Sequence, residues 1–253
     1  MNHREHRGHR GHGERLIYQI FLCALGVLCV LCVSFLASGC GRQEAEETRA
    51  AATGNGIIKG RVVFLGAPPE EKIIAGSPMV QDESIVVGTG RGLKNVIVYL
   101  KDAPASASAL PAPAVLDQVK CVYVPHVLAI QAGQVLRVKS SDAVLHNVHL
   151  KCLVNPDVNF GFAGVGQRDV TLASPEAPFA VRCDVHPWMS AWIGVFDHPW
   201  FAVTGDDGSF TIEHVPAGQY TLVAWQETLP QQERQITVEA AGQTEAGFTF
   251  EAP

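Results

Sequence analysis

The pattern of hydrophobic and polar positions changes sharply after the first 55 residues. Residues 16–38 are almost wholly apolar, whereas from Gly56 onward the apolar residues come in short β-branched runs separated by glycine and proline. Such runs, bounded by turn residues, are typical of β-strands, and no helical period of useful length occurs after residue 40. The pattern therefore predicts an all-β chain beyond residue 55.

The predicted strands are separated by short turns and by two longer connections. Residues 103–115 are a low-complexity Ala/Pro/Ser stretch, 154–167 are a connection containing Asn and Gly, and Pro125 interrupts one run. Turn residues at intervals of about 8–12 positions suit a Greek-key β-sandwich. The predicted strands are residues 57–66, 95–100, 121–131, 134–139, 146–153, 169–172, 178–182, 191–196, 235–238 and 247–250, together with a strand, hairpin and strand over 201–212 and a turn followed by a strand over 215–225.

The apolar run at 16–38 predicts export and attachment to a membrane. About 23 apolar residues are enough for the h-region of a signal peptide or for a membrane span. The run ends in LASGC, which resembles a bacterial lipoprotein cleavage box with Cys40 as the lipidated residue, although Ala37 stands where that box has leucine. An uncleaved membrane helix is the alternative. Either anchor places the rest of the chain outside the cytoplasm, and the polar residues 41–55 read as a flexible linker.

The net charge of the chain beyond residue 40 indicates which classes of binding partner to expect. Beyond residue 40 the chain keeps 15 basic and 23 acidic side chains, a formal charge of −8. Because no basic face is evident, we expect no nucleic-acid partner. A moderately acidic surface suits a dispersed, exported protein and would steer a basic redox partner.

Four residues with metal-binding side chains form the most informative pattern. Cys183, His186 and Met189 follow the spacing Cys-x2-His-x2-Met, and His146 lies about 37 residues before them in a strand-like run. Soft sulfur donors hold Cu(I) and imidazoles hold Cu(II), so the set suits a metal that cycles between these states. We therefore predict one mononuclear copper ion bound by these residues.

These motifs resemble the cupredoxins, most closely the amicyanin-like group, over roughly residues 119–197. That group also has a His-Asn-Val-His strand end, here residues 146–149, and a short Cys-x2-His-Pro-aromatic-Met loop, here 183–189. The resemblance implies a cupredoxin sandwich with a blue-copper site, whose ligands are His146, Cys183, His186 and Met189.

The resemblance also implies roles for residues beside the ligands. Asn147 would tie the ligand loop to the neighbouring strand, with its backbone amide near the Cys183 sulfur, and Pro187 would shape the exposed edge of His186. With Cys183 on the metal, Cys121 and Cys152 could pair as a disulfide in an oxidising compartment, although three thiols do not make a disulfide framework.

The last 53 residues carry a second resemblance. A strand, an Asp-Gly hairpin at 206–208 and a Val-Pro-Ala-Gly turn followed by a strand look like the carboxypeptidase-regulatory, transthyretin-like β-sandwich. The opening strands of that module match 57–66 and 95–100, so we predict that the cupredoxin domain is inserted into it. An N-terminal extension of the cupredoxin sheet is the alternative. The predicted parts are a signal or anchor segment (1–40), a linker (41–55), the cupredoxin domain (103–197), and the regulatory-like sandwich (56–102 plus 198–253).

Other uses of the same residues fit less well. Zinc usually takes paired Cys and His ligands, which the isolated His146 and the Met189 thioether do not provide. A hydrolytic Cys183–His146 pair leaves the neighbouring His186 and Met189 without a role.

We therefore expect a membrane-tethered, extracytoplasmic copper protein that carries single electrons to an unidentified protein partner. No covalent bond is made or broken in that role, so we expect no enzymatic activity. The alternatives are a copper-delivery protein without redox traffic, and a structural or carbohydrate-adhesion module whose copper site is idle.

Overall fold

The computed structural model describes residues 54–68, 70, 73, 82–106 and 108–251. Within these residues the protein is all-β, as the hydrophobic pattern predicts, apart from one 3-10 turn, η1 (Thr89–Arg91). Among the same residues, none of the helical structure has the length and hydrophobicity of a membrane span. The apolar segment 16–38, the predicted lipidation site Cys40 and most of the linker lie outside the described residues.

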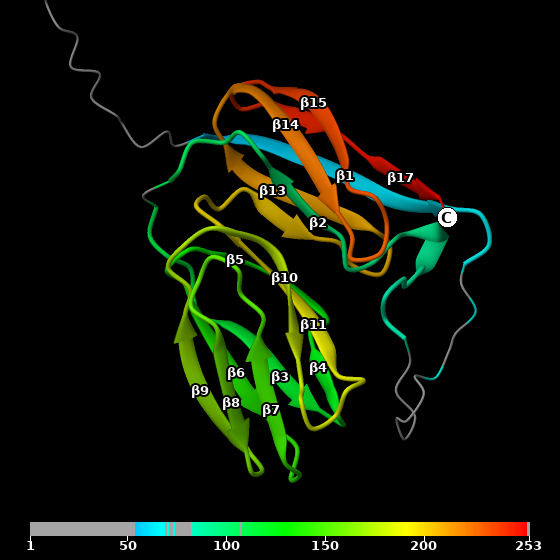
Figure 1. The fold of residues 1–253 in the computed structure, drawn as a ribbon. Coiled ribbons are helices and arrows are strands. Elements are labelled where there is room, and N and C mark those ends of the chain that lie inside the picture. The colour runs from blue at the N-terminus through cyan, green and yellow to red at the C-terminus, as the bar shows by residue number, and fades with distance from the viewer. Residues whose placement is uncertain (1–53, 69, 71–72, 74–81, 107, 252–253) are drawn as a thin grey trace, which may run out of the picture. The chain divides into compact units, whose positions relative to one another are not determined.

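The first sandwich is built from the two ends of the described chain (Figure 1). One sheet has the order β13-β1-β16, with β17 also paired to β1, and the other has the order β12-β2-β14-β15. Ile58, Val62 and Phe64 alternate along β1 and are fully buried between the sheets. Its strands are β1 (Gly56–Leu65), β2 (Ile97–Leu100), β12 (Phe201–Val203), β13 (Ser209–Val215), β14 (Gly218–Trp225), β15 (Gln232–Val238), β16 (Gln243–Glu245) and β17 (Phe248–Glu251).

The second sandwich is formed by the chain between β2 and β12. Its sheets have the orders β4-β3-β6-β9 and β5-β11-β10-β7-β8. The chain thus leaves the first sandwich after β2 and returns to it at β12. The strands are β3 (Ala114–Val119), β4 (Val122–Val124), β5 (Val127–Gln131), β6 (Val135–Ser140), β7 (His146–Leu150), β8 (Val158–Phe162), β9 (Gly166–Thr171), β10 (Glu176–Arg182) and β11 (Ser190–Phe196).

Two connections predicted from the sequence contain strands. The 154–167 segment includes β8, an edge strand that pairs only with β7, so its Asn and Gly residues are tolerated. The Ala/Pro/Ser segment runs into β3. In addition, Pro125 separates β4 and β5 into different sheets, so the predicted 121–131 strand is two strands that belong to opposite layers.

The two sandwiches contact each other through an apolar cluster and one polar group of side chains. Ile97 of the first sandwich packs with Val127 and Phe196 of the second. Glu227 accepts hydrogen bonds from Trp192 Nε1 and pairs with His126 Nε2, each at 2.5 Å. Because these groups are buried, the contact restrains the two sandwiches relative to each other.

Candidate metal centre

A tight loop between β10 and β11 carries three of the four predicted ligands. The last rung of the β10–β11 ladder is Arg182 opposite Ser190. Beyond it, the Cys183 N–H donates to the Met189 carbonyl at 3.4 Å, and the Met189 N–H donates to the His186 carbonyl at 2.9 Å. These bonds hold both ends of the loop together, so the backbone atoms of Cys183, His186 and Met189 lie close to one another.

The fourth predicted ligand, His146, begins β7 and is fully buried. Its Nδ1 lies 2.8 Å from the Nδ1 of His186, and the Cys183 Sγ lies 3.9 Å from that same His186 atom. One donor atom from each of these three residues falls within 4.8 Å of the others. The structure therefore brings His146, Cys183 and His186 to a common centre.

Met189 lies in the same buried cluster as Cys183, with 1% of its surface exposed. Asp184 and Val185 of the same loop are exposed. Pro187 is exposed, and the half-buried Trp188 lies 5.0 Å from the His186 ring, centroid to centroid. Met189 is thus the loop side chain that is buried beside the thiol.

Two backbone N–H groups point at the Cys183 sulfur. The sulfur is 3% exposed and accepts hydrogen bonds from the His186 N–H at 3.3 Å and the Asn147 N–H at 3.5 Å. A thiolate is the form of cysteine that binds metal, and it accepts hydrogen bonds more strongly than a thiol does.

The two imidazoles suit a cation between them. Burial, and then the nearby His146, lower the pKa of His186, which keeps it neutral. A neutral imidazole is the form that binds metal. Two imidazole Nδ1 atoms and a cysteine sulfur that lie close together make a donor set that fits copper in either oxidation state.

Asp142 is a part of the site that sequence reasoning missed. Its carboxylate accepts hydrogen bonds from the backbone N–H groups of Lys120 (2.7 Å) and Cys121 (2.8 Å), and lies 2.9 Å from the His146 Nε2. The carboxylate therefore fixes the tautomer of His146 so that Nδ1 is left free. The only signal in the sequence was an acidic residue four positions before the histidine.

Asn147 links the His146 strand to the ligand loop through its side chain. Its Nδ2 donates to Asp184 Oδ2 at 2.9 Å and to Asn159 Oδ1 at 2.8 Å, and its Oδ1 accepts from the Asp184 N–H. This contact lies one residue from Cys183. It holds the first turn of the loop against β7.

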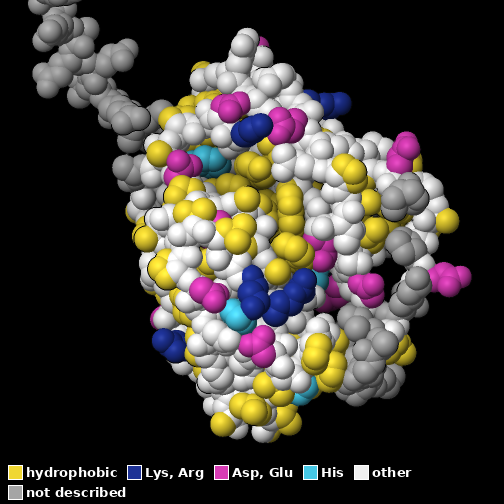
Figure 2. All heavy atoms as spheres, in the orientation of Figure 1, with side chains coloured by type: hydrophobic (Ala, Val, Ile, Leu, Met, Phe, Trp, Pro, Cys, Tyr) yellow, Lys and Arg dark blue, Asp and Glu magenta, His cyan; other side chains and the backbone are white. Residues whose placement is uncertain are grey.

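Apolar side chains surround the accessible edge of the centre. Val144 and Leu145, just before His146, are 49% and 53% exposed, and Val185, just before His186, is 43% exposed. Figure 2 shows hydrophobic side chains gathered at the lower end of the view. Exposed apolar residues in a group of this kind mark contact surfaces more often than single ones do.

The three cysteines among the described residues are not paired. Cys121, Cys152 and Cys183 are all free thiols, so the disulfide considered between Cys121 and Cys152 is not formed. Cys121 lies near Asp142 and His146, whereas Cys152 follows the other end of β7. Opposite ends of a five-residue strand are too far apart for a disulfide.

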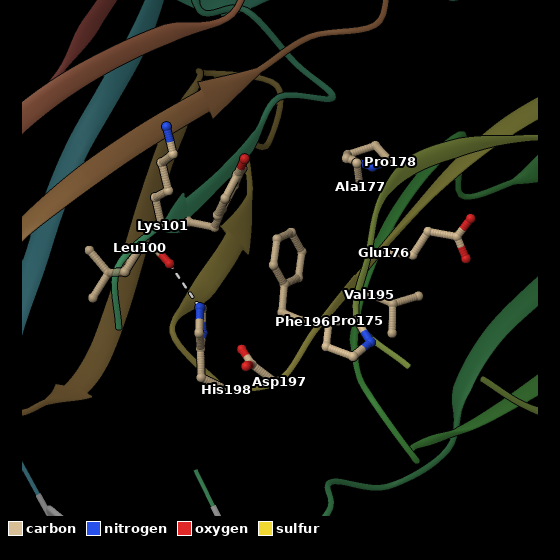
Figure 3. A pocket seen from close by; sticks show the side chains of 11 residues that line it. Leu100, Lys101, Pro175, Glu176, Ala177, Pro178, Val195, Phe196, Asp197 and His198 are labelled. Atoms are coloured by element: carbon tan, nitrogen blue, oxygen red, sulfur yellow. Dashed lines mark hydrogen bonds between the residues drawn. The ribbon is translucent and has the colours of Figure 1, made fainter. Parts of the chain in front are cut away.

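A shallow hollow lies at the opposite ends of β10 and β11 (Figure 3). It has a volume of about 280 Å³, and three of its polar side chains already have partners. His198 Nε2 donates to the Leu100 carbonyl at 2.8 Å, Lys101 pairs with Glu233 at 3.0 Å, and Glu176 accepts from the Val154 and Asn155 N–H groups. None of the four predicted ligands lines the hollow, so it is separate from the metal centre.

Sequence comparison gives one partial family match. The model of polysaccharide lyase family 4, domain II, matches residues 199–246, which belong to the first sandwich. No curated protein matches the chain.

Solved structures similar to this chain include copper proteins. They are a copper-containing nitrite reductase (NirK) from Thermus scotoductus SA-01, a purple cupredoxin from Nitrosopumilus maritimus and amicyanin from Paracoccus versutus. Their identities are 15%, 18% and 20%, and their TM-scores are 0.32, 0.28 and 0.30. The matches cover 53%, 32% and 39% of this chain, and 28%, 98% and 96% of theirs. The chain is thus similar to these copper proteins over part of its length. The likeness is too weak to assign a metal, so that assignment depends on the donor atoms alone.

Proposed function

We propose that this protein binds one copper ion through His146, Cys183, His186 and Met189 and carries single electrons. The observation that supports the proposal most strongly is the convergence of two imidazole Nδ1 atoms, 2.8 Å apart, beside a buried thiol that receives two backbone N–H groups. Copper, when bound, supplies the one-electron couple.

The protein's own groups set the conditions for that couple. Cys183 binds as a thiolate. The Asp142 carboxylate accepts a hydrogen bond from the Nε2–H of His146, which leaves Nδ1 free for the metal. The closed loop and β7 hold the donors in one geometry, so that little atomic rearrangement accompanies a change of charge. A fixed donor geometry favours fast electron exchange.

The partner of this site is another redox protein. His186 is the half-exposed ligand, and the exposed apolar residues Val144, Leu145 and Val185 lie around it. Small, weak interfaces suit partners that must separate after each transfer. No bond making is required, so the role is that of a carrier and not of an enzyme.

The location and the second module belong to the same proposal. We propose an extracytoplasmic protein held at the membrane by a lipid on Cys40 or by an uncleaved helix over 16–38. The first sandwich would be a carboxypeptidase-regulatory, transthyretin-like module that holds the copper domain by both of its ends. Its strand pairing through β1, β2 and 201–251 supports this proposal.

Copper delivery is a second candidate function. One observation favours it, namely the half-buried Cys121 thiol, which lies with Asp142 beside His146 and adds a soft donor at the edge of the centre. A delivery protein needs donors that exchange copper, whereas a carrier needs donors that keep it.

Copper titration of the full chain under visible spectroscopy tests both functions. A carrier gives an intense thiolate-to-copper band toward the red end of the visible, which Cys183→Ser abolishes and Cys152→Ser, a change at a free thiol outside the centre, retains. Tight binding without this band favours delivery. A folded protein that takes up no copper refutes both.

A further inference from the structure

The β7–β10 ladder stops just before the metal centre. Its two rungs are Val181 opposite Leu150 and Arg182 opposite His149. Beyond the Arg182–His149 rung, toward the metal centre, the two strands are no longer paired. There the Asn147 N–H donates to the Cys183 sulfur instead. The two ligand-bearing segments therefore separate where the metal would enter, and something other than the ladder must set their spacing.

A buried tyrosine spans this gap. Tyr123, on β4 of the opposite sheet, is 1% exposed. Its hydroxyl donates to the Asn147 carbonyl at 2.6 Å and also contacts the Arg182 carbonyl at 3.1 Å, a three-centre hydrogen bond. Asn147 follows His146 and Arg182 precedes Cys183, so one hydroxyl ties together the backbone beside two predicted ligands.

Gln118 supports the same point from the neighbouring strand. It lies directly opposite Tyr123 in the β3–β4 ladder, is fully buried, and donates from Nε2 to the Asn147 carbonyl at 3.1 Å. Its Oε1 has no protein hydrogen-bond partner among the described residues. A buried polar group that is only partly satisfied is costly, and it indicates a role other than filling the core.

We infer that Tyr123, with Gln118, is a positioning residue that fixes the spacing between the His146 and Cys183 segments. This inference rests on the copper site proposed above. Burial, and then the charge of a Cys183 thiolate, raise the pKa of Tyr123, so the hydroxyl remains a donor over the whole physiological range.

The test is Tyr123→Phe, which removes only the hydroxyl, with Tyr220→Phe as the matched control. Tyr220 is also buried and donates to a backbone carbonyl, that of Pro216 at 3.0 Å, but it belongs to the first sandwich. Each full-length variant is measured for thermal unfolding without metal, copper dissociation constant, visible spectrum and reduction potential.

We expect Tyr123→Phe to weaken copper binding about tenfold or more, as loss of groups that orient ligands does, and to change the relative intensities of the visible bands. Tyr220→Phe should lower the unfolding temperature by a similar amount and leave the copper signals unchanged. Gln118→Met, which removes one weaker bond, should shift the same signals in the same direction by less, and it serves if Tyr123→Phe does not fold.

The results separate this inference from the proposed function. A wild-type chain without a thiolate-to-copper band refutes the proposed function and the inference with it. A wild-type chain with the band, together with unchanged spectra and copper affinity in Tyr123→Phe and Gln118→Met, refutes the inference alone. Equal changes in Tyr123→Phe and Tyr220→Phe also refute it, because the effect would then reflect general stability.

Discussion

The Asp142 carboxylate offers a sharp test of how the centre is held. It receives three donors, namely the Lys120 and Cys121 N–H groups and, at 2.9 Å, the His146 Nε2. Asp142→Asn keeps the size of the side chain but replaces one acceptor oxygen with an amide that donates. One carboxylate oxygen accepts from the Lys120 N–H, and the other faces both the Cys121 N–H and His146 Nε2. The new amide must replace one of these oxygens, and in either place its N–H groups oppose a donor.

The expected loss follows from this geometry. Carboxylates that hold a metal-binding histidine typically contribute a factor of about 10–100 to metal affinity, which corresponds to about 1.4–2.7 kcal/mol. We expect Asp142→Asn to raise the copper dissociation constant by that factor. Part of the loss arises because the His146 Nδ1 is no longer fixed as the free nitrogen.

The assay is a competitive copper titration, with Asp117→Asn as the control. Both carboxylates have 16% of their side-chain surface exposed, but Asp117 pairs with Lys139 at 3.1 Å and accepts from Ser141 Oγ at 2.8 Å, away from the donors. Asp117→Asn should leave the copper affinity within a factor of about two, as a surface-like substitution does. If the two variants lost equal affinity, the proposed role of Asp142 would be wrong.

Three further predictions concern the scaffold. Burial opposes the charged form of Glu176, but hydrogen bonds from the Asn155 side chain and the 153–155 backbone lower its pKa overall, so its stabilisation exists above the ordinary value and is lost as pH falls through the lowered one. Glu176→Gln should cost about 1–3 kcal/mol in urea unfolding at pH 7 and nothing in strong acid. Burial opposes the charged form of His126, but its bond and charge pairing with Glu227 raise its pKa overall, so this contribution is present below the ordinary value and lost as pH rises through the raised one. Glu227→Gln should therefore destabilise by about 1.5–3 kcal/mol at pH 6 and by less at pH 9, measured by tryptophan fluorescence, and an equal loss at both values would contradict the pairing. Ile130→Ala, at a fully buried site in the second core, should cost about 2–5 kcal/mol in the same assay, and a loss under 1 kcal/mol would show that the core relaxes around it.

The fold was predictable from sequence to the extent that it rests on local alternation. Strands such as β1, with Ile58, Val62 and Phe64 on one face, carry a strong two-residue period and were predicted within one or two residues. The edge strand β8 was missed, because its Asn and Gly residues are poor strand formers and it pairs with one neighbour only, β7. Local propensity does not contain that pairing.

The candidate site also combines residues that the sequence predicts with residues that it does not predict. The spacing of Cys183, His186 and Met189 is local, so their grouping could be predicted from the loop alone. Tyr123 could not be, because it lies on β4 of the opposite sheet and meets the site only after the sheets pack. Asp142 lies in the connection before β7, and its place four residues before His146 is too common a spacing to mark it.

The position of His149 shows how strand geometry selects ligands within a motif. Successive residues of a strand point to opposite faces, so His146, Val148 and Leu150 share the face that lines the core, while Asn147 and His149 share the other. His149 accordingly lies between the carboxylates of Asp157 (3.1 Å) and Asp184 (3.3 Å), outside the centre. A slip of one residue in the β7–β8 register, in which His146 lies opposite Phe162, would exchange the two histidines between faces. The register of an edge pairing that the sequence did not reveal therefore decides which imidazole meets Cys183.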